Sequence, residues 1–262
     1  MSSARSKSPD YENIAKTYSE INELQVQWGK ELVANAGVER GHKVLDMGCG
    51  TGELTSYIAE LVGNDGHVVG VDPDVERIKI AVEKHSYGNI IFRYGESSSK
   101  FPHYDEQYFD IHFSNFIFQW LNNYEKNIFV QAALDCLKPG GKIAIQSHDE
   151  QPEIVNEFTK LLVPNSAECN SPKVHLLEKN AAEELLENNG FHIVSSKYMF
   201  KSFEFQNIAQ FCSWVYASDY CDARKVSSLC IKNFANRFIN QDGSLILRDP
   251  SIYQIIGLKM HS

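Results

Sequence analysis

The chain lacks an apolar run long enough to cross a membrane, and its N-terminus lacks the apolar core of a signal peptide. It also lacks an excess of positive charge, since 25 Lys and Arg face 34 Asp and Glu for a formal net charge of -9. A protein of that charge disfavours the phosphate backbone of DNA or RNA as a partner. These absences predict a cytoplasmic protein with neither a membrane nor a nucleic-acid partner.

Clustered cysteines are also absent. The six cysteines are scattered, and no two have the C-x-x-C spacing of a metal or redox site, so we expect reduced thiols and no bound metal. With 262 residues, 43% of them hydrophobic, the chain can form one α/β domain with a sizeable core. We predict a disordered tail over 1–9 and a single domain over 10–262. The sequence leaves the oligomeric state open.

What is present is a glycine-rich turn between an expected strand and an expected helix. The apolar pair Val44-Leu45 leads into 46–52 (Asp-Met-Gly-Cys-Gly-Thr-Gly), and apolar residues then recur with a helical period over 54–62. Such a unit binds nucleotide-like ligands through backbone N–H groups. The dinucleotide fingerprint needs its third glycine where this chain has Glu53, which argues against a nicotinamide or flavin cofactor.

Four more strands are expected along the first half of the chain. The run 68–71 ends in Asp72, a carboxylate placed to bind a ribose diol, and 90–92 leads to Gly95-Glu96-Ser97. A fourth strand is expected over 109–115, and its last residues, Ser114 and Asn115, begin the loop that follows. A Pro-Gly-Gly turn then precedes a fifth strand up to Ile145. Helical patterns separate these strands, which predicts a parallel sheet with its ligand at the carboxyl ends of the strands.

The flanking segments have their own patterns. A long helix is expected over about 11–36, and further helices over 52–62, 74–85, 123–137 and 178–189. We expect a sixth strand over 191–199, a final strand over 252–259, and between them an insert, 203–250, that is rich in aromatic residues. Such inserts often form a wall of the substrate pocket.

These motifs, in this order, resemble those of the class I S-adenosylmethionine (SAM) methyltransferases. The resemblance implies a Rossmann-like α/β fold: a seven-stranded, mostly parallel sheet with an antiparallel last strand, helices on both faces, N-terminal lid helices and a helical insert before the last strand. It implies SAM as the cofactor. The cofactor-binding residues that it implies are Asp46, Gly48, Cys49, Gly50, Gly52, Asp72, Pro73, Glu96, Ser97, Ser114 and Asn115.

The loop after the fourth strand carries the clue to the methyl acceptor. It contains no acid or base and lacks the Asn/Asp-Pro-Pro-Tyr motif of nucleic-acid base and protein-glutamine methyltransferases. Gln119 and Trp120 are neutral donors suited to holding a carboxylate. With Tyr18 and Gln25, they resemble the small-molecule carboxyl methyltransferases of the juvenile hormone acid and trans-aconitate types. This resemblance implies that these four residues act on the acceptor, which we interpret as a small organic acid methylated on a carboxylate oxygen.

Three other interpretations stay open. A small-molecule N-methyltransferase would use the same aromatic pocket for a neutral amine, and a non-catalytic SAM-binding module would keep the same motifs. An arsenite methyltransferase would need converging thiols, for which Cys169, Cys212 and Cys221 are candidates. The histidines His112, His148 and His192 are interpreted as strand or loop residues, with His148 the best placed of them for a base.

Overall fold

A single mixed sheet organises the molecule. The computed structural model describes residues 9–85, 87–161, 174–218 and 220–260, and within them seven strands pair in the order β3-β2-β1-β4-β5-β7-β6. The strands are β1 (Lys43–Met47), β2 (His67–Asp72), β3 (Ile90–Tyr94), β4 (Phe109–Asn115), β5 (Leu137–His148), β6 (Phe191–Phe205) and β7 (Leu245–Lys259).

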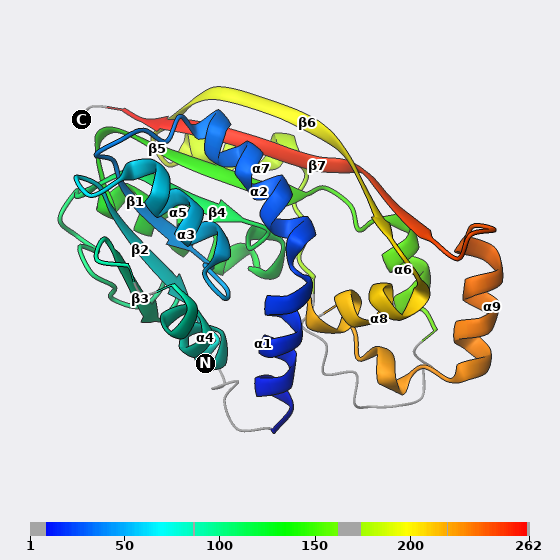
Figure 1. Cartoon of the computed structure of the whole chain (residues 1–262). Helices are drawn as coiled ribbons and strands as arrows, with labels where there is room; N and C mark the ends of the chain where they lie inside the picture. The colour runs from blue at the N-terminus through cyan, green and yellow to red at the C-terminus, as the bar shows by residue number, and fades with distance from the viewer. Residues whose placement is uncertain (1–8, 86, 162–173, 219, 261–262) are drawn as a thin grey trace.

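The strand directions fix where a ligand can bind. β1 pairs in parallel with β2 and β4, whereas β7 runs antiparallel to both β5 and β6. The order reverses between β1 and β4, and the carboxyl ends of these strands therefore form the crevice at which ligands of open α/β sheets bind. The expected Rossmann-like fold with an antiparallel last strand is confirmed (Figure 1).

Nine α-helices are assigned within the described residues: α1 (Pro9–Ile21), α2 (Glu23–Ala36), α3 (Glu53–Val62), α4 (Val75–Lys84), α5 (Asn123–Cys136), α6 (Glu153–Thr159), α7 (Lys179–Asn188), α8 (Ile208–Ala217) and α9 (Ser228–Phe238). Two of them start at strong caps. The Asp74 carboxylate accepts from two amides at the start of α4, and Asn122 and Glu125 form a capping box at the start of α5.

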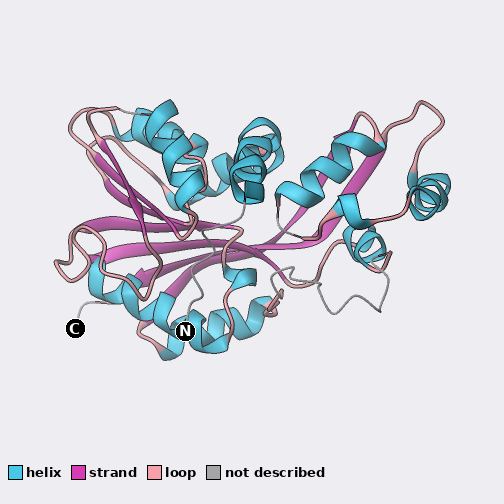
Figure 2. Ribbon diagram, turned by 90° about the horizontal axis from the view of Figure 1, so that it is seen from below, coloured by secondary structure: helices cyan, strands magenta, loops and turns pink. Residues whose placement is uncertain are grey.

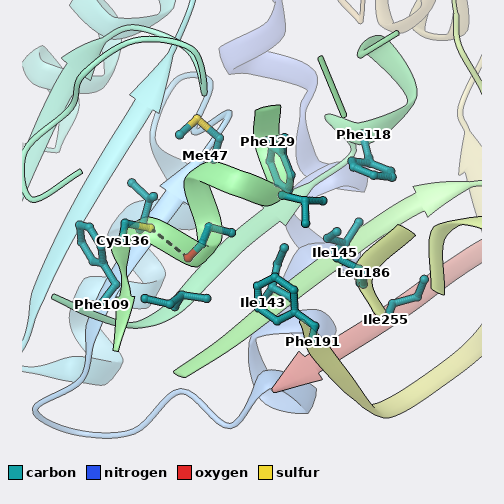
Figure 3. Close-up of a cluster of buried hydrophobic side chains, with 14 of the residues drawn as sticks. Met47, Phe109, Phe118, Phe129, Cys136, Ile143, Ile145, Leu186, Phe191 and Ile255 are labelled. Carbon is teal, nitrogen blue, oxygen red and sulfur yellow. Dashed lines mark hydrogen bonds between the residues drawn. The ribbon is translucent and has the colours of Figure 1, made fainter. Parts of the chain in front are cut away.

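Alternating strand residues bury both faces of the sheet. On β5, Ala144 faces a cluster with α2 and α3, whereas Ile143 and Ile145 face a cluster with α5 and α7. Figure 3 shows the second cluster, in which Phe129 of α5 and Leu186 of α7 lie against the strands. Figure 2 shows the resulting three layers, with helices above and below the sheet.

A third apolar cluster lies beyond this central part. The C-terminal half of β6 and the N-terminal half of β7 extend beyond the other strands as a two-stranded ribbon (Figure 1). Helices α6, α8 and α9 pack around it, and Phe158, Phe211 and Phe234 of these helices join Phe205 of β6 in one apolar cluster. This arrangement confirms a helical insert before the last strand. In the described part of the chain, no helix combines the length and apolar character needed to span a bilayer.

The structure corrects several predicted boundaries. The expected helix over 11–36 is two helices separated by Asn22, whose amide donates to Thr51 and Glu53 and so joins the break to the glycine turn. The last two strands pair further than their short apolar runs indicated, which reduces the insert to 206–244. Pro9 begins α1, and residues 1–8 of the expected tail lie outside the described residues.

Candidate active site

A cavity of about 460 Å3 opens at the carboxyl ends of the strands. It runs from the glycine turn and the end of β2, past the loop after β4, to the end of β5 and the start of β7. Helices α1, α2 and α8 contribute Tyr18, Gln25 and Trp214 to its wall. Its size lies in the range of small-molecule sites.

The glycine turn forms a backbone cradle on one side of this cavity. Gly48 and Gly50 both line it with positive φ values of 86° and 57°, which side chains rarely adopt. A Cβ atom on Gly48 would lie 2.1 Å from the Ile117 side chain, so the loop after β4 packs directly on the turn. At Gly50 the nearest atom to an added Cβ would be on the Tyr18 ring, at 3.4 Å, so α1 lies over the turn at that residue.

Asp72 holds the cradle in place from the end of β2. Its Oδ2 accepts from the Gly50 amide at 2.9 Å and its Oδ1 accepts from the Asp74 amide at 2.8 Å. Each carboxylate oxygen retains a second lone pair, and Asp72 lines the cavity. A vicinal diol is therefore a suitable ligand for this carboxylate.

Of the eleven predicted cofactor residues, six line the cavity: Gly48, Gly50, Asp72, Pro73, Glu96 and Asn115. The other five lie behind its wall. Asp46 accepts from the Thr55 hydroxyl at 2.6 Å, Cys49 packs on α4, and Gly52 caps the start of α3. Ser97 and Ser114 are buried. Their positions would let them support the site without touching a ligand.

These residues fit SAM. Gly48 and Gly50 bring backbone to the cavity, Asp72 offers acceptors for a ribose, and Asp46 and Asp72 are carboxyl groups whose ionised form a bound sulfonium would favour. When bound, SAM supplies an electrophilic methyl group, and the protein contributes orientation and exclusion of water.

Burial raises the pKa of both aspartates. Burial raises the pKa of Asp46 to about 7, with the Thr55 hydroxyl acting in the opposite direction and the nearby Asp72 charge adding to the rise. Burial also raises the pKa of Asp72, despite the Arg77 charge and the two amides that favour the ionised form. A cation bound beside them would favour ionisation of both groups.

We therefore expect SAM binding to release protons near neutral pH. Its affinity should rise by up to about tenfold between pH 6 and pH 8, because the pKa of Asp46 falls when the cation binds. Calorimetric titration in two buffers with different ionisation enthalpies would count the protons. Asp46→Asn should reduce that count, and proton uptake on binding would contradict the expectation.

Helix α1 covers the cavity and is fixed to its surroundings. The ring of Tyr18 lies under the Arg77 guanidinium at 4.3 Å, and Arg77 donates to the Ala217 carbonyl of α8 at 3.1 Å. The Ser19 hydroxyl donates to Glu53 at 3.1 Å. The helix thus contacts both α4 and α8 and closes the cavity over Gly50.

Gln25 bridges two parts of the wall. Its Nε2 donates to the Ser218 hydroxyl at 3.0 Å, and its backbone carbonyl accepts from the Asn115 amide at 3.0 Å. Its side-chain Oε1 is buried and has no partner among the described residues. A bound ligand would supply the missing partner.

The other end of the cavity is aromatic. The Trp120 ring lies 5.5 Å from that of Tyr220, which in turn lies 5.5 Å from Trp214. The buried Gln119 side chain accepts from the Ser147 hydroxyl at 3.0 Å, so its Nε2 is the end that can donate. The cavity is lined by Gln119, Trp120, Trp214 and Tyr220. Its aromatic end can therefore hold an apolar molecule and donate a hydrogen bond to a polar group on it.

A pair of residues that the sequence did not bring together lies in this aromatic end. His148 Nδ1 lies 2.7 Å from Asp249 Oδ2, and both residues are buried and line the cavity. The Phe116 ring stacks on His148 at 4.8 Å, and Phe116 is one of three non-glycine residues with positive φ in the described chain. Backbone strain of this kind concentrates at functional sites.

Two of the three thiols considered for arsenite chemistry, Cys212 and Cys221, lie in the described residues. Cys221 is buried and Cys212 is half-buried, and burial raises the pKa of Cys212 to about 11. Cys169 lies outside the described residues. Among those residues, no group of three or more His, Cys, Asp or Glu side chains is arranged to hold a metal ion.

Fold and cradle together define a class I SAM-dependent methyltransferase. A family model for the methyltransferase domain matches residues 38–211, and the chain belongs to this methyltransferase domain family. One curated relative is the ubiquinone/menaquinone biosynthesis C-methyltransferase UbiE of Shewanella sediminis, 27% identical over 166 residues. The match covers 59% of this chain and 65% of that relative, which is just under two-thirds of its length.

Solved structures share the fold at low identity. A putative methyltransferase from Bacillus halodurans aligns with a TM-score of 0.61 and 18% identity, covering 88% of this chain and 98% of that one. Phosphoethanolamine N-methyltransferase 2 of Haemonchus contortus, solved in complex with SAM, has a TM-score of 0.55 and 16% identity, over 90% of this chain and 53% of that one.

Proposed function

We propose that this SAM-dependent methyltransferase acts on a small, mainly apolar organic molecule bound at the aromatic end of the cavity. The observation that carries the proposal is the enclosed wall formed by Trp120, Trp214 and Tyr220 beside the glycine cradle. Helix α1 contributes Tyr18 to the wall of the same cavity, and the net charge of -9 disfavours a nucleic acid. A cytoplasmic location remains a prediction.

Two alternative kinds of polar group on the acceptor would suit this aromatic wall. A carboxylate, as the sequence predicts, would meet the amide of Gln119 and the indole N–H of Trp120. A ring that carries a hydroxyl is favoured by a different observation, since the UbiE relative is named as a C-methyltransferase of quinone biosynthesis. Both acceptors are small molecules, and both place an apolar body between the aromatic rings.

Substitution of the aromatic wall would test the proposal. Trp120→Ala should raise the KM for the acceptor by about tenfold or more while SAM affinity changes less than about twofold, because only the acceptor contacts are lost. The measurement is methyl transfer from labelled SAM to pools of small acids, phenols and amines, with calorimetry for SAM. Gln131→Ala, an exposed change on α5, is the matched control.

Macromolecules belong in the same assay. Transfer of label to tRNA, DNA or protein with none to any small-molecule pool would overturn the proposed function. Unchanged acceptor kinetics in Trp120→Ala would remove the aromatic wall from the acceptor site.

A further inference from the structure

His148 and Asp249 are two buried, ionisable side chains that lie 2.7 Å apart and line the cavity. Asp249 is fully buried, and burying a carboxylate is costly unless it is paired and hydrogen-bonded. Its Oδ1 accepts from the amide of Ser251 at 2.9 Å and from the Ser251 hydroxyl at 2.7 Å, and its Oδ2 faces His148. The carboxylate is thus oriented from two sides.

Asp249 stays ionised in this setting. Burial alone would raise its pKa, but the His148 ring and the Ser251 hydroxyl and amide together hold the pKa below its ordinary value. The Asp249 carboxylate oxygen lies 2.7 Å from Nδ1, and neither atom has another partner among the described residues, which favours the neutral imidazole with its proton on that nitrogen. The lone pair then lies on Nε2 of a side chain that lines the cavity.

The strained loop after β4 reinforces this orientation. Phe116 has φ of +58°, and its amide donates to the Gln146 carbonyl at 2.9 Å, which ties the loop to β5 two residues before His148. Its ring stacks on the imidazole with an interplanar angle of 26°. His148 is therefore held by a carboxylate at one edge and by an aromatic ring on one face.

Given the proposed function, on which this step rests, we propose that His148 is the general base for the acceptor, with Asp249 as its positioning residue. The acceptor group is then an ionisable hydroxyl, a phenol or an enol. A carboxylate is already ionised at neutral pH and would leave such a base without a task.

The proton and electron balance is simple for this acceptor. The O–H bond breaks as its proton forms a bond with His148 Nε2, and an electron pair of the acceptor forms the bond to the methyl carbon. The C–S bond of the sulfonium breaks, and its electron pair remains on sulfur. The imidazolium, stabilised by Asp249, then returns its proton to solvent. If the new bond forms at an enol carbon, the same oxygen proton is the one lost.

The experiment compares two variants with a matched control. His148→Asn retains a donor in the place of Nδ1 but removes Nε2, and Asp249→Asn removes the charge that orients the ring. His192→Asn changes an exposed histidine on β6 and serves as the control. The probes are catechol, 4-nitrophenol and acetylacetone as hydroxyl or enol acceptors, against benzoate, octanoate and benzylamine.

We expect methyl transfer to the hydroxyl or enol set, with kcat rising with pH as general-base catalysis requires. His148→Asn should lower kcat by about 100-fold or more and remove that pH limb, and Asp249→Asn should lower kcat by about tenfold or more. SAM affinity, measured by calorimetry, should stay within about twofold of wild type in both. The Tyr220 hydroxyl also lines the cavity near Asp249, but burial and the Asp249 charge raise its pKa, so it stays neutral over this range.

A second readout does not depend on turnover. Nitrogen-15 spectra of histidine-labelled protein should show His148 with its proton on Nδ1 at pH 8, and Asp249→Asn should abolish that preference. A proton on Nε2 in wild type would overturn the inference. So would methylation of benzoate, octanoate or benzylamine at an unchanged rate in His148→Asn, an outcome that leaves the proposed function standing. Failure to methylate any small molecule would instead defeat the proposed function itself.

Discussion

Gly50→Val is expected to weaken SAM binding by about 100-fold. Gly50 lines the cavity with φ of +57°, and an added Cβ would lie 3.4 Å from the Tyr18 ring, so the two further methyl groups of valine would occupy the space of the ligand. A steric cost of about 3 kcal/mol corresponds to about a 100-fold loss of affinity. Calorimetric titration with SAM measures this loss directly.

Gly41→Val is the matched control for that variant. Gly41 has φ of +83°, and no atom lies within 4 Å of the Cβ that would be added. It therefore imposes similar backbone strain away from the cavity, and we expect lower thermal stability with unchanged SAM affinity. If Gly50→Val bound SAM as tightly as Gly41→Val, the glycine turn would not be the cofactor site.

Asp46→Asn is expected to stabilise the free protein in alkaline solution while weakening its hold on SAM. The pKa of Asp46 rises from 3.8 to about 7 on folding, chiefly through burial. The contribution of Asp46 to the free energy of unfolding is therefore fully present below about pH 4 and is lost as the pH rises through 7. The reason is that the carboxyl group ionises more readily in the unfolded chain than in the folded protein. The loss amounts to at most about 4 kcal/mol, and asparagine does not ionise.

Thermal unfolding without SAM at two pH values would check this expectation. At pH 8 the Tm of Asp46→Asn should exceed that of wild type by about 5 °C or more, and at pH 4 the two should coincide. Asp65→Asn, at a largely exposed carboxylate, should show no such difference. Equal Tm values at pH 8 would mean that Asp46 ionises freely in the folded protein.

Local patterns predicted the strands and the glycine turn around Asp46 and Asp72 well. The apolar run before Asp46, the glycine spacing and the run ending in Asp72 each occupy a few consecutive residues, and each forms where the sequence indicates. Their mutual placement follows from parallel pairing of β1 with β2, because the carboxyl ends of parallel strands meet at one edge.

The acceptor half could not be predicted in the same way. His148 meets Asp249 only because β5 pairs with β7 in a register that places His148 opposite Ile252. Gln25 contacts Ser218 because α2 and α8 meet over the cavity. Nothing in the residues around Asp249 marks it as a partner for a histidine, and the contact depends on how distant segments pack.

A row of hydrogen-bonded side-chain amides distinguishes α1 from α2, the two N-terminal helices at the cavity. Asn35 donates to Gln254, Gln254 to Gln146, Gln146 to Asn115, and Asn115 to the backbone of Gln25. This row fastens α2 to the middle of the sheet at two points, whereas α1 is held mainly by surface contacts on α4 and α8. Of the two helices at the cavity, α2 is therefore the one that is bonded to the sheet itself, and we expect α1 rather than α2 to shift when a ligand enters or leaves.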